Sequence, residues 1–225
     1  MTVTLAVGCL WPVFGRRAAD VGLVVPRSWL QWRRACRNFL LAALVMLLPA
    51  AGFAAAATLL GGRTFPFRPP GPGIDLYEYT TAAAAGPTEE IIVVVLLVVA
   101  LRAARVPWWG VILVGVTARL AYHVYYGPAV IGLVPWAIAA VLFWRRTGAV
   151  IPLLLAHSLW DVVGVAINRN GSSDVPSLLL YLGFMLCAVG GLIVVVFFFA
   201  RTVPAGPARR HGGRVSTRSS EQDSP

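Results

Sequence analysis

The sequence contains no lysine: all 19 basic residues are arginine, and only nine residues are acidic. Charged residues make up 12% of the chain, about half the share of a soluble domain, whereas hydrophobic residues make up 58%. This balance, with a mean hydropathy of +0.76, excludes an ordinary water-soluble domain and predicts a protein that crosses a membrane several times.

Cysteine is scarce as well, and its spacing excludes two further classes. The three cysteines form no CxxC pair and no metal-site spacing: Cys9, Cys36 and Cys187. We expect free thiols on apolar faces and no disulfide. The net charge of +10 does not indicate nucleic-acid binding, because no basic face interleaved with aromatics is visible. We expect membrane lipid as a partner, and no nucleic acid.

Six apolar segments have about the length of membrane-spanning helices. They lie at 38–60, 79–101, 107–126, 128–144, 148–168 and 176–200. Residues 1–37 are predicted to form an interfacial, amphipathic segment in which tryptophan and arginine share a helix, and residues 201–225 a disordered basic tail. The fold predicted is all-α: a polytopic transmembrane helix bundle of about six spans in 38–200, around a four-helix core in 80–168.

The arginines predict the orientation of the bundle. With six spans, the arginine-rich ends before span one and after spans two, four and six all lie on one side, which is therefore cytoplasmic. Both termini are then inside the cell. The use of arginine alone is associated with GC-rich coding sequences, so we expect a multi-pass protein of the cell membrane, typically a bacterial plasma membrane.

Six ionisable side chains lie within the apolar segments of this core. Charges in hydrocarbon are costly, so such residues indicate a functional site. Each of three segments contributes two of them: Glu89 and Glu90, Arg119 and His123, His157 and Asp161. The last two pairs are four residues apart and share a helix face, whereas adjacent glutamates diverge by about 100°. At most one glutamate is then expected to point straight into a shared cavity.

The residues around the two glutamates predict a helix start inside the membrane. Gly86, Pro87 and Thr88 precede them, and proline suits the first turn of a helix while threonine can cap it. Acidic residues favour that end of the helix dipole. The sequence therefore predicts a broken or re-entrant entry, with both glutamates at a helix N-terminus.

These residue types support hydrolysis of a peptide bond. A glutamate and a histidine in a site of low dielectric constant can activate a water molecule. A second polar pair opposite them can stabilise the oxyanion that forms when the water attacks a carbonyl. Ser158 beside His157 does not suggest a catalytic triad, because adjacent helix residues diverge and the chain offers no nucleophile motif.

The three pairs resemble the motifs of the CPBP family, the CAAX proteases and bacteriocin-processing (Abi) proteins. The family pattern is EExxxR, then FxxxH, then HxxxN or HxxxD, and the resemblance covers residues 80–168. It implies an intramembrane endopeptidase, similar to CAAX prenyl proteases, that cleaves membrane-associated peptides or proteins, possibly lipidated. By resemblance, Glu89 and His123 are the catalytic water-activating pair, and His157 and Asp161 steady the oxyanion or complete the site. Glu90 is then structural.

Two positions depart from the family pattern. Val94 replaces the arginine of EExxxR, and Arg119 replaces the phenylalanine of FxxxH. A buried Glu90 without a partner is costly, and so is a lone arginine in a membrane. We therefore predict that Glu90 and Arg119 form an interhelical ion pair behind Glu89 and His123. The departures equally fit an inactive relative that acts as a bacteriocin self-immunity or membrane scaffold protein.

A metal ion is not favoured, and no cofactor is expected. Members of the family have been called metalloproteases, and Glu89, His123 and His157 are a legitimate zinc ligand set. The chain has no HExxH motif, and water activation by glutamate and histidine explains the same residues without an ion. Zinc stays the alternative. Proton or ion transport is a further alternative, although no internal repeat supports it.

Overall fold

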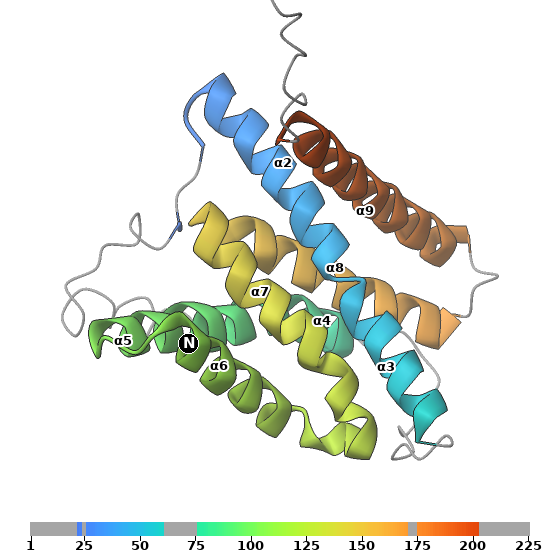
Figure 1. Cartoon of the computed structure of the whole chain (residues 1–225). Coiled ribbons are helices and arrows are strands. Elements are labelled where there is room, and N and C mark those ends of the chain that lie inside the picture. Colours follow the sequence, from blue (N-terminus) through green and yellow to red (C-terminus); the bar gives the residue numbers. More distant parts are fainter. Residues whose placement is uncertain (1–21, 24–25, 61–75, 171–174, 203–225) are drawn as a thin grey trace, which may run out of the picture.

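The computed structural model describes residues 22–23, 26–60, 76–170 and 175–202, and these hold helices and no strand (Figure 1). The predicted all-α bundle is confirmed. The elements are α2 (Trp29–Val45), α3 (Leu48–Leu59), α4 (Leu76–Glu89), the π-helix η2 (Glu90–Leu96), α5 (Leu97–Ala103), α6 (Trp108–Tyr122), the 3-10 helix η3 (Val124–Leu133), α7 (Val134–Thr147), α8 (Ile151–Asn170) and α9 (Val175–Thr202).

Three helical rods have the length and hydropathy of membrane spans: Trp29–Leu59, Leu76–Ala103 and Val124–Thr147. Three shorter apolar helices accompany them, at Trp108–Tyr122, Ile151–Ile167 and Tyr181–Val195. Each of the six predicted spans therefore overlaps a helix, and among the described residues three helices meet both the length and the hydropathy of a membrane span.

The first rod differs from the prediction. An interfacial helix ending near Arg37 was expected before a separate span, but α2 begins at Trp29 and continues without a break to Val45. Ser28 caps it, accepting a hydrogen bond from the backbone N–H of Gln31. The break comes later, between α2 and α3, where Pro49 cannot donate the next backbone bond.

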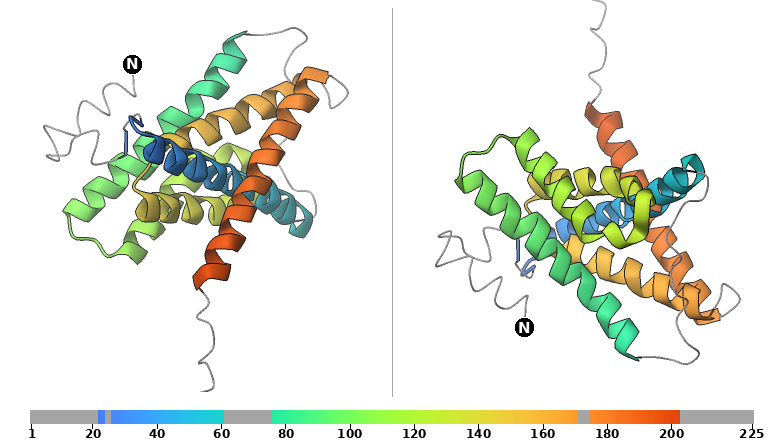
Figure 2. Two further views of the ribbon diagram at one scale, coloured as in Figure 1. Left: turned by 90° about the horizontal axis from the view of Figure 1, so that it is seen from above. Right: turned by 90° about the horizontal axis from the view of Figure 1, so that it is seen from below.

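The predicted helix start at Thr88 is wrong. α4 passes through Pro87 and leads directly into η2 and α5, so one rod runs from Leu76 to Ala103 (Figure 2, right). Thr88 does not cap; its hydroxyl donates to the carbonyl of Ala84 one turn back. The two glutamates therefore lie in mid-helix, where the α-helix widens into a π-helix, a feature frequent at functional sites.

The predicted fourth span also begins differently. The chain leaves α6 at His123 and forms the 3-10 helix η3 before α7 starts at Val134, rather than entering a helix at Pro128. Gly127 lies inside η3 with φ 69° and ψ −156°, a region open almost only to glycine. This kink turns the chain sharply between α6 and α7, so that His123 lies at a corner rather than in a helix.

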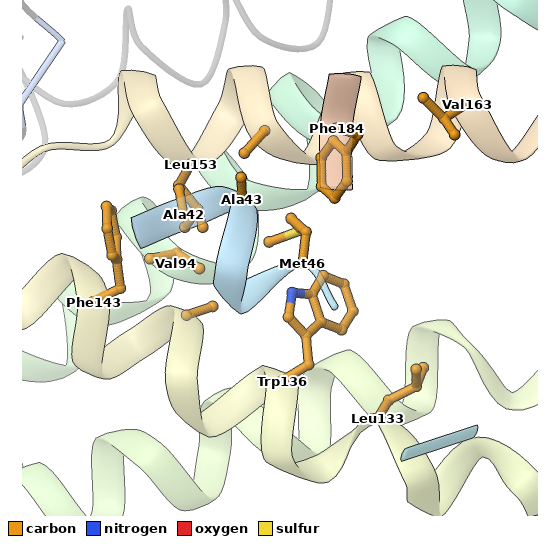
Figure 3. Close-up of a cluster of buried hydrophobic side chains, with 12 residues drawn as sticks. Ala42, Ala43, Met46, Val94, Leu133, Trp136, Phe143, Leu153, Val163 and Phe184 are labelled. Atoms are coloured by element: carbon orange, nitrogen blue, oxygen red, sulfur yellow. The ribbon is translucent and has the colours of Figure 1, made fainter. Parts of the chain in front are cut away.

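The main hydrophobic core takes its buried side chains from α2, η2, η3, α7, α8 and α9, with Met46 directly after α2. α2 packs against α8 and α9, α4 packs against α8, and η3 packs against α3 (Figures 1 and 2). The buried side chains form one cluster, drawn in Figure 3, that includes Met46, Val94, Trp136, Leu153 and Phe184. Val94, the position of the family's arginine, is thus a fully buried core residue.

Parts of two sequence predictions lie outside the described residues. They are the remainder of the interfacial segment at 1–21 and of the disordered tail at 203–225.

Candidate active site

The structure brings all six ionisable residues into one buried cluster. Glu89 and Glu90 come from the junction of α4 and η2, Arg119 and His123 from the end of α6, and His157 and Asp161 from α8. Five of them are buried, and Asp161 keeps 28% of its side chain exposed. The cluster is therefore accessible from the side on which Asp161 lies.

Glu90 is at the centre of the ion-pair network. Arg119 Nη2 donates to its Oε2 at 2.8 Å, and His157 Nδ1 donates to its Oε1 at 2.8 Å. The structure thus contains the interhelical Glu90–Arg119 pair that the sequence predicts. Each carboxylate oxygen has a protein partner and the side chain has no solvent exposure, so Glu90 is placed to hold the network together rather than to meet a reacting water.

Glu89 is more weakly held. Its Oε2 lies 3.5 Å from Arg119 Nη1 and 3.6 Å from His123 Nε2. Both glutamates reach the same arginine, but through different nitrogens: Glu89 contacts Nη1 and Glu90 contacts Nη2. Of these two carboxylates, Glu89 is the one that also lies near His123.

The tautomer of His123 follows from its backbone contact. Nδ1 lies 2.9 Å from the carbonyl oxygen of Arg119, which can only accept, so Nδ1 carries the hydrogen. In the neutral ring, Nε2 then has the free lone pair, and it faces Glu89 at 3.6 Å. A base nitrogen and a carboxylate oxygen at this separation can contact the same water molecule.

His157 lies between two carboxylates. Its Nδ1 binds Glu90, and its Nε2 lies 3.4 Å from Asp161 Oδ2, as expected for residues four apart on one helix. The link to Glu90 was not expected, because the sequence assigned the two residues to separate functions. His157 therefore belongs both to the ion-pair network and to the open side of the site.

A proline fixes α8 against α4 next to this cluster. Pro87 has no N–H, so the carbonyl of Ala83 receives no helical hydrogen bond from it. Ser158 Oγ on α8 donates to this carbonyl instead, at 2.7 Å. Gly86 permits the approach, because a Cβ there would lie 2.6 Å from Ser158 Oγ and 2.6 Å from the carbonyl oxygen of Leu154. Ser158, dismissed as a nucleophile, is thus a helix-packing residue beside His157.

We expect Gly86→Ala to open this contact. The added methyl group would push α8 away from α4, because two of its three nearest neighbours, the Leu154 carbonyl oxygen and the Ser158 nitrogen, are backbone atoms that cannot rotate aside. The free energy of unfolding should fall by about 1–3 kcal/mol, the range for overpacking in a tight interior. Thermal unfolding in detergent checks this, with Gly164→Ala as the matched control, since a Cβ at Gly164 on α8 meets nothing within 4 Å. Equal losses in the two variants would contradict the packing argument.

Two aromatic residues at the site are not among the residues that the sequence predicts there. Trp136 on α7 is buried, and the Arg119 guanidinium carbon lies 4.1 Å from its ring centroid. Tyr126 stacks on His123 with 5.8 Å between ring centroids. From the sequence alone, tryptophan and tyrosine near segment ends are expected at the membrane–water interface. The signal that could have found Tyr126 is its position three residues after His123, at a Gly-Pro turn.

The site offers a poor ligand set for zinc. No group of three or more histidine, cysteine, aspartate or glutamate residues in the described part of the chain is placed to hold a metal ion. The chemistry of the donors explains this: both nitrogens of His157 face carboxylates, and His123 directs only Nε2 toward Glu89. The set of Glu89, His123 and His157 does not converge on one point.

Comparison with known proteins identifies the segment that holds the site. A family model described as type II CAAX prenyl endopeptidase Rce1-like matches residues 76–163, from the first residue of α4 into α8, and includes all six ionisable residues. No curated protein and no solved structure gave a match. The resemblance to the CPBP family is thereby confirmed, and residues 76–163 are similar to the Rce1-like type II CAAX prenyl endopeptidases.

Proposed function

We propose that this protein is an intramembrane endopeptidase in which Glu89 and His123 activate the attacking water. The observation that carries the proposal is the geometry of this pair. Glu89 Oε2 and His123 Nε2 are 3.6 Å apart, and the hydrogen bond from Nδ1 to the Arg119 carbonyl turns the free lone pair of His123 toward Glu89. Glu89 is the one glutamate of the two with oxygens not fully occupied by protein groups in the described residues.

The reaction is hydrolysis. Glu89, assisted by His123, removes a proton from water as the water oxygen attacks the carbonyl carbon of the peptide bond. The carbonyl oxygen becomes an oxyanion in a tetrahedral intermediate. The C–N bond then breaks, and the proton is passed to the leaving nitrogen. The products are a new carboxylate and a new amine.

His157 and Asp161 are the proposed stabilisers of the oxyanion. The Nε2–H of His157 lies at the open side of the cluster, where a substrate carbonyl can approach it. Asp161 Oδ2 lies 3.4 Å from this nitrogen, so an incoming oxyanion can take the hydrogen bond from Nε2–H. Asp161 then orients His157, while Glu90 holds its other nitrogen.

The proposed substrates are membrane-associated peptides or proteins, which include lipidated ones. A test would use the full chain in lipid nanodiscs with membrane-bound peptides, in oxygen-18 water. We expect cleavage at an internal bond and one labelled oxygen in each new carboxylate. Intact peptide after long incubation, or a product without label, would contradict hydrolysis.

An inactive scaffold or immunity protein is the second candidate. One observation favours it: Arg119, Glu90 and His157 form an interhelical network that would hold the bundle together without any reaction. The two candidates differ in Glu89. A scaffold keeps its cellular phenotype in Glu89→Gln, because Glu90 carries the strong contacts of the network.

We propose that activity does not depend on zinc. The active protein should contain no stoichiometric zinc by elemental analysis, and its cleavage rate should stay unchanged after treatment with EDTA, because the activating groups are side chains. The control is the same protein incubated with added zinc. Loss of cleavage in EDTA, with recovery only on adding zinc, would instead make Glu89, His123 and His157 metal ligands.

We further propose a cell-membrane location with both termini in the cytoplasm, and contact with anionic lipid. α2 and α9 border an open groove of about 340 Å³ with Trp29, Trp32, Arg33 and Arg37 on its walls, a combination suited to the headgroup region. For topology, Ser219→Cys in a background without the three native cysteines should be labelled only after the cells are opened. Labelling of intact cells would reverse the orientation.

A further inference from the structure

Trp136 touches three of the ionisable residues of the site. The Arg119 guanidinium carbon lies 4.1 Å from the centroid of its ring. The ring of His157 lies 5.2 Å away and is perpendicular to it, at 87°, and the ring of His123 lies 5.9 Å away at 80°. α7 supplies none of the six ionisable residues, so Trp136 is its contribution to the cluster.

The indole makes these contacts at a cost. Its Nε1 is buried and has no hydrogen-bond partner in the described part of the chain. Buried tryptophans usually find a partner for this N–H, and a phenylalanine or leucine would avoid the loss. Tryptophan differs from these residues in that the face of its ring attracts a cation most strongly among the aromatic side chains. The ring belongs to the main apolar core and lies beside Met46 in Figure 3, and its 3% exposure keeps water away from it.

Arg119 requires such a support. It must direct Nη1 to Glu89 and Nη2 to Glu90 at the same time, at 3.5 Å and 2.8 Å. An arginine side chain has several rotatable bonds, so its planar fork must be held in place to reach both carboxylates at once. In the orientation that does so, the guanidinium carbon lies 4.1 Å from the centroid of the Trp136 ring.

We propose that Trp136 is a positioning residue, which holds Arg119 across Glu89 and Glu90 and fixes the two histidine rings by its edge-to-face contacts. Its effect on catalysis rests on the function proposed above. Trp136 is almost fully buried and does not touch substrate, so it acts on the turnover step through Arg119 and the histidines.

The test is a series of fluorinated tryptophans at position 136. Successive fluorine atoms weaken the attraction of the ring for a cation while they change its shape little. We expect the thermal unfolding midpoint to fall stepwise with fluorine number, and kcat for peptide cleavage to fall several-fold while KM changes little. The matched control is the same series at Trp109, which is 72% exposed and should show no trend.

A second background isolates the partner. In the Glu90→Leu/Arg119→Met protein, which removes both charges together, the fluorine trend at position 136 should disappear. A flat series in the native background, or an equal trend with and without Arg119, would overturn the proposal. If fluorination lowers the unfolding midpoint but leaves kcat unchanged, Trp136 stabilises the core without positioning the catalytic groups, and the proposal fails. If the native protein cleaves nothing, the proposed function fails, and the unfolding series still decides whether the ring holds Arg119.

Discussion

Replacing Arg119 with methionine should lower the free energy of unfolding by about 3–5 kcal/mol, the loss typical of breaking a buried ion pair. Arg119 is the partner of two glutamates, and Glu90 is completely shielded from solvent. Without the arginine, the hydrogen bond from His157 would be the remaining contact, among those of the described residues, that stabilises the negative charge of Glu90. A large loss is expected because the charge left behind has neither water nor an adequate partner.

A partial rescue is expected for the same reason. The double variant Glu90→Leu/Arg119→Met should be more stable than Arg119→Met alone, because the fully shielded Glu90 carboxylate is removed together with its partner and only the more weakly held Glu89 loses its arginine. Chemical unfolding in detergent measures both. Arg34→Met is the control, since Arg34 is an exposed residue of α2 and its loss should stay within about 0.5 kcal/mol. Additive losses in the double variant would show that the two charges are not coupled.

The second large effect concerns the water-activating pair. Glu89→Gln and His123→Ala should each lower kcat by about 10²–10⁴-fold, the range for losing a general base. Because the two groups act on one water, the double variant should be little slower than the slower single variant. The measurement is single-turnover cleavage in nanodiscs, with the unfolding midpoint as a check on folding. Multiplied effects in the double variant would mean that the two residues act in separate steps.

The sequence was sufficient for the fold class and for the composition of the site. Apolar length and the cost of buried charge locate the helices and pick out all six ionisable residues without reference to packing. The Glu90–Arg119 contact was predictable for the same reason, since each would otherwise be a lone charge. The match of the family model to residues 76–163 agrees with the motifs, because these motifs lie in that segment.

The backbone around the site was not predictable in the same way. Gly-Pro before two glutamates has the pattern of a helix start, yet the helix continues through Pro87 because Ser158, distant in sequence, satisfies the carbonyl that the proline leaves free. The π-helix that begins at Glu90 has no pattern in the residue types that would predict it. A tryptophan near the end of an apolar segment is typical of the membrane interface. Trp136 is buried instead because the turn at Gly127 brings α7 back against α6, and the residue types alone do not predict that turn.

The most direct test of the central claim is the initial cleavage rate of Glu89→Gln compared with that of Glu78→Gln. Both variants remove one carboxylate charge from α4, but only Glu89 faces His123. If Glu89 activates the water, Glu78→Gln cleaves the membrane-bound peptide at the native rate, and Glu89→Gln, although folded, forms almost no product. Cleavage by Glu89→Gln at the rate of Glu78→Gln would contradict the proposed mechanism.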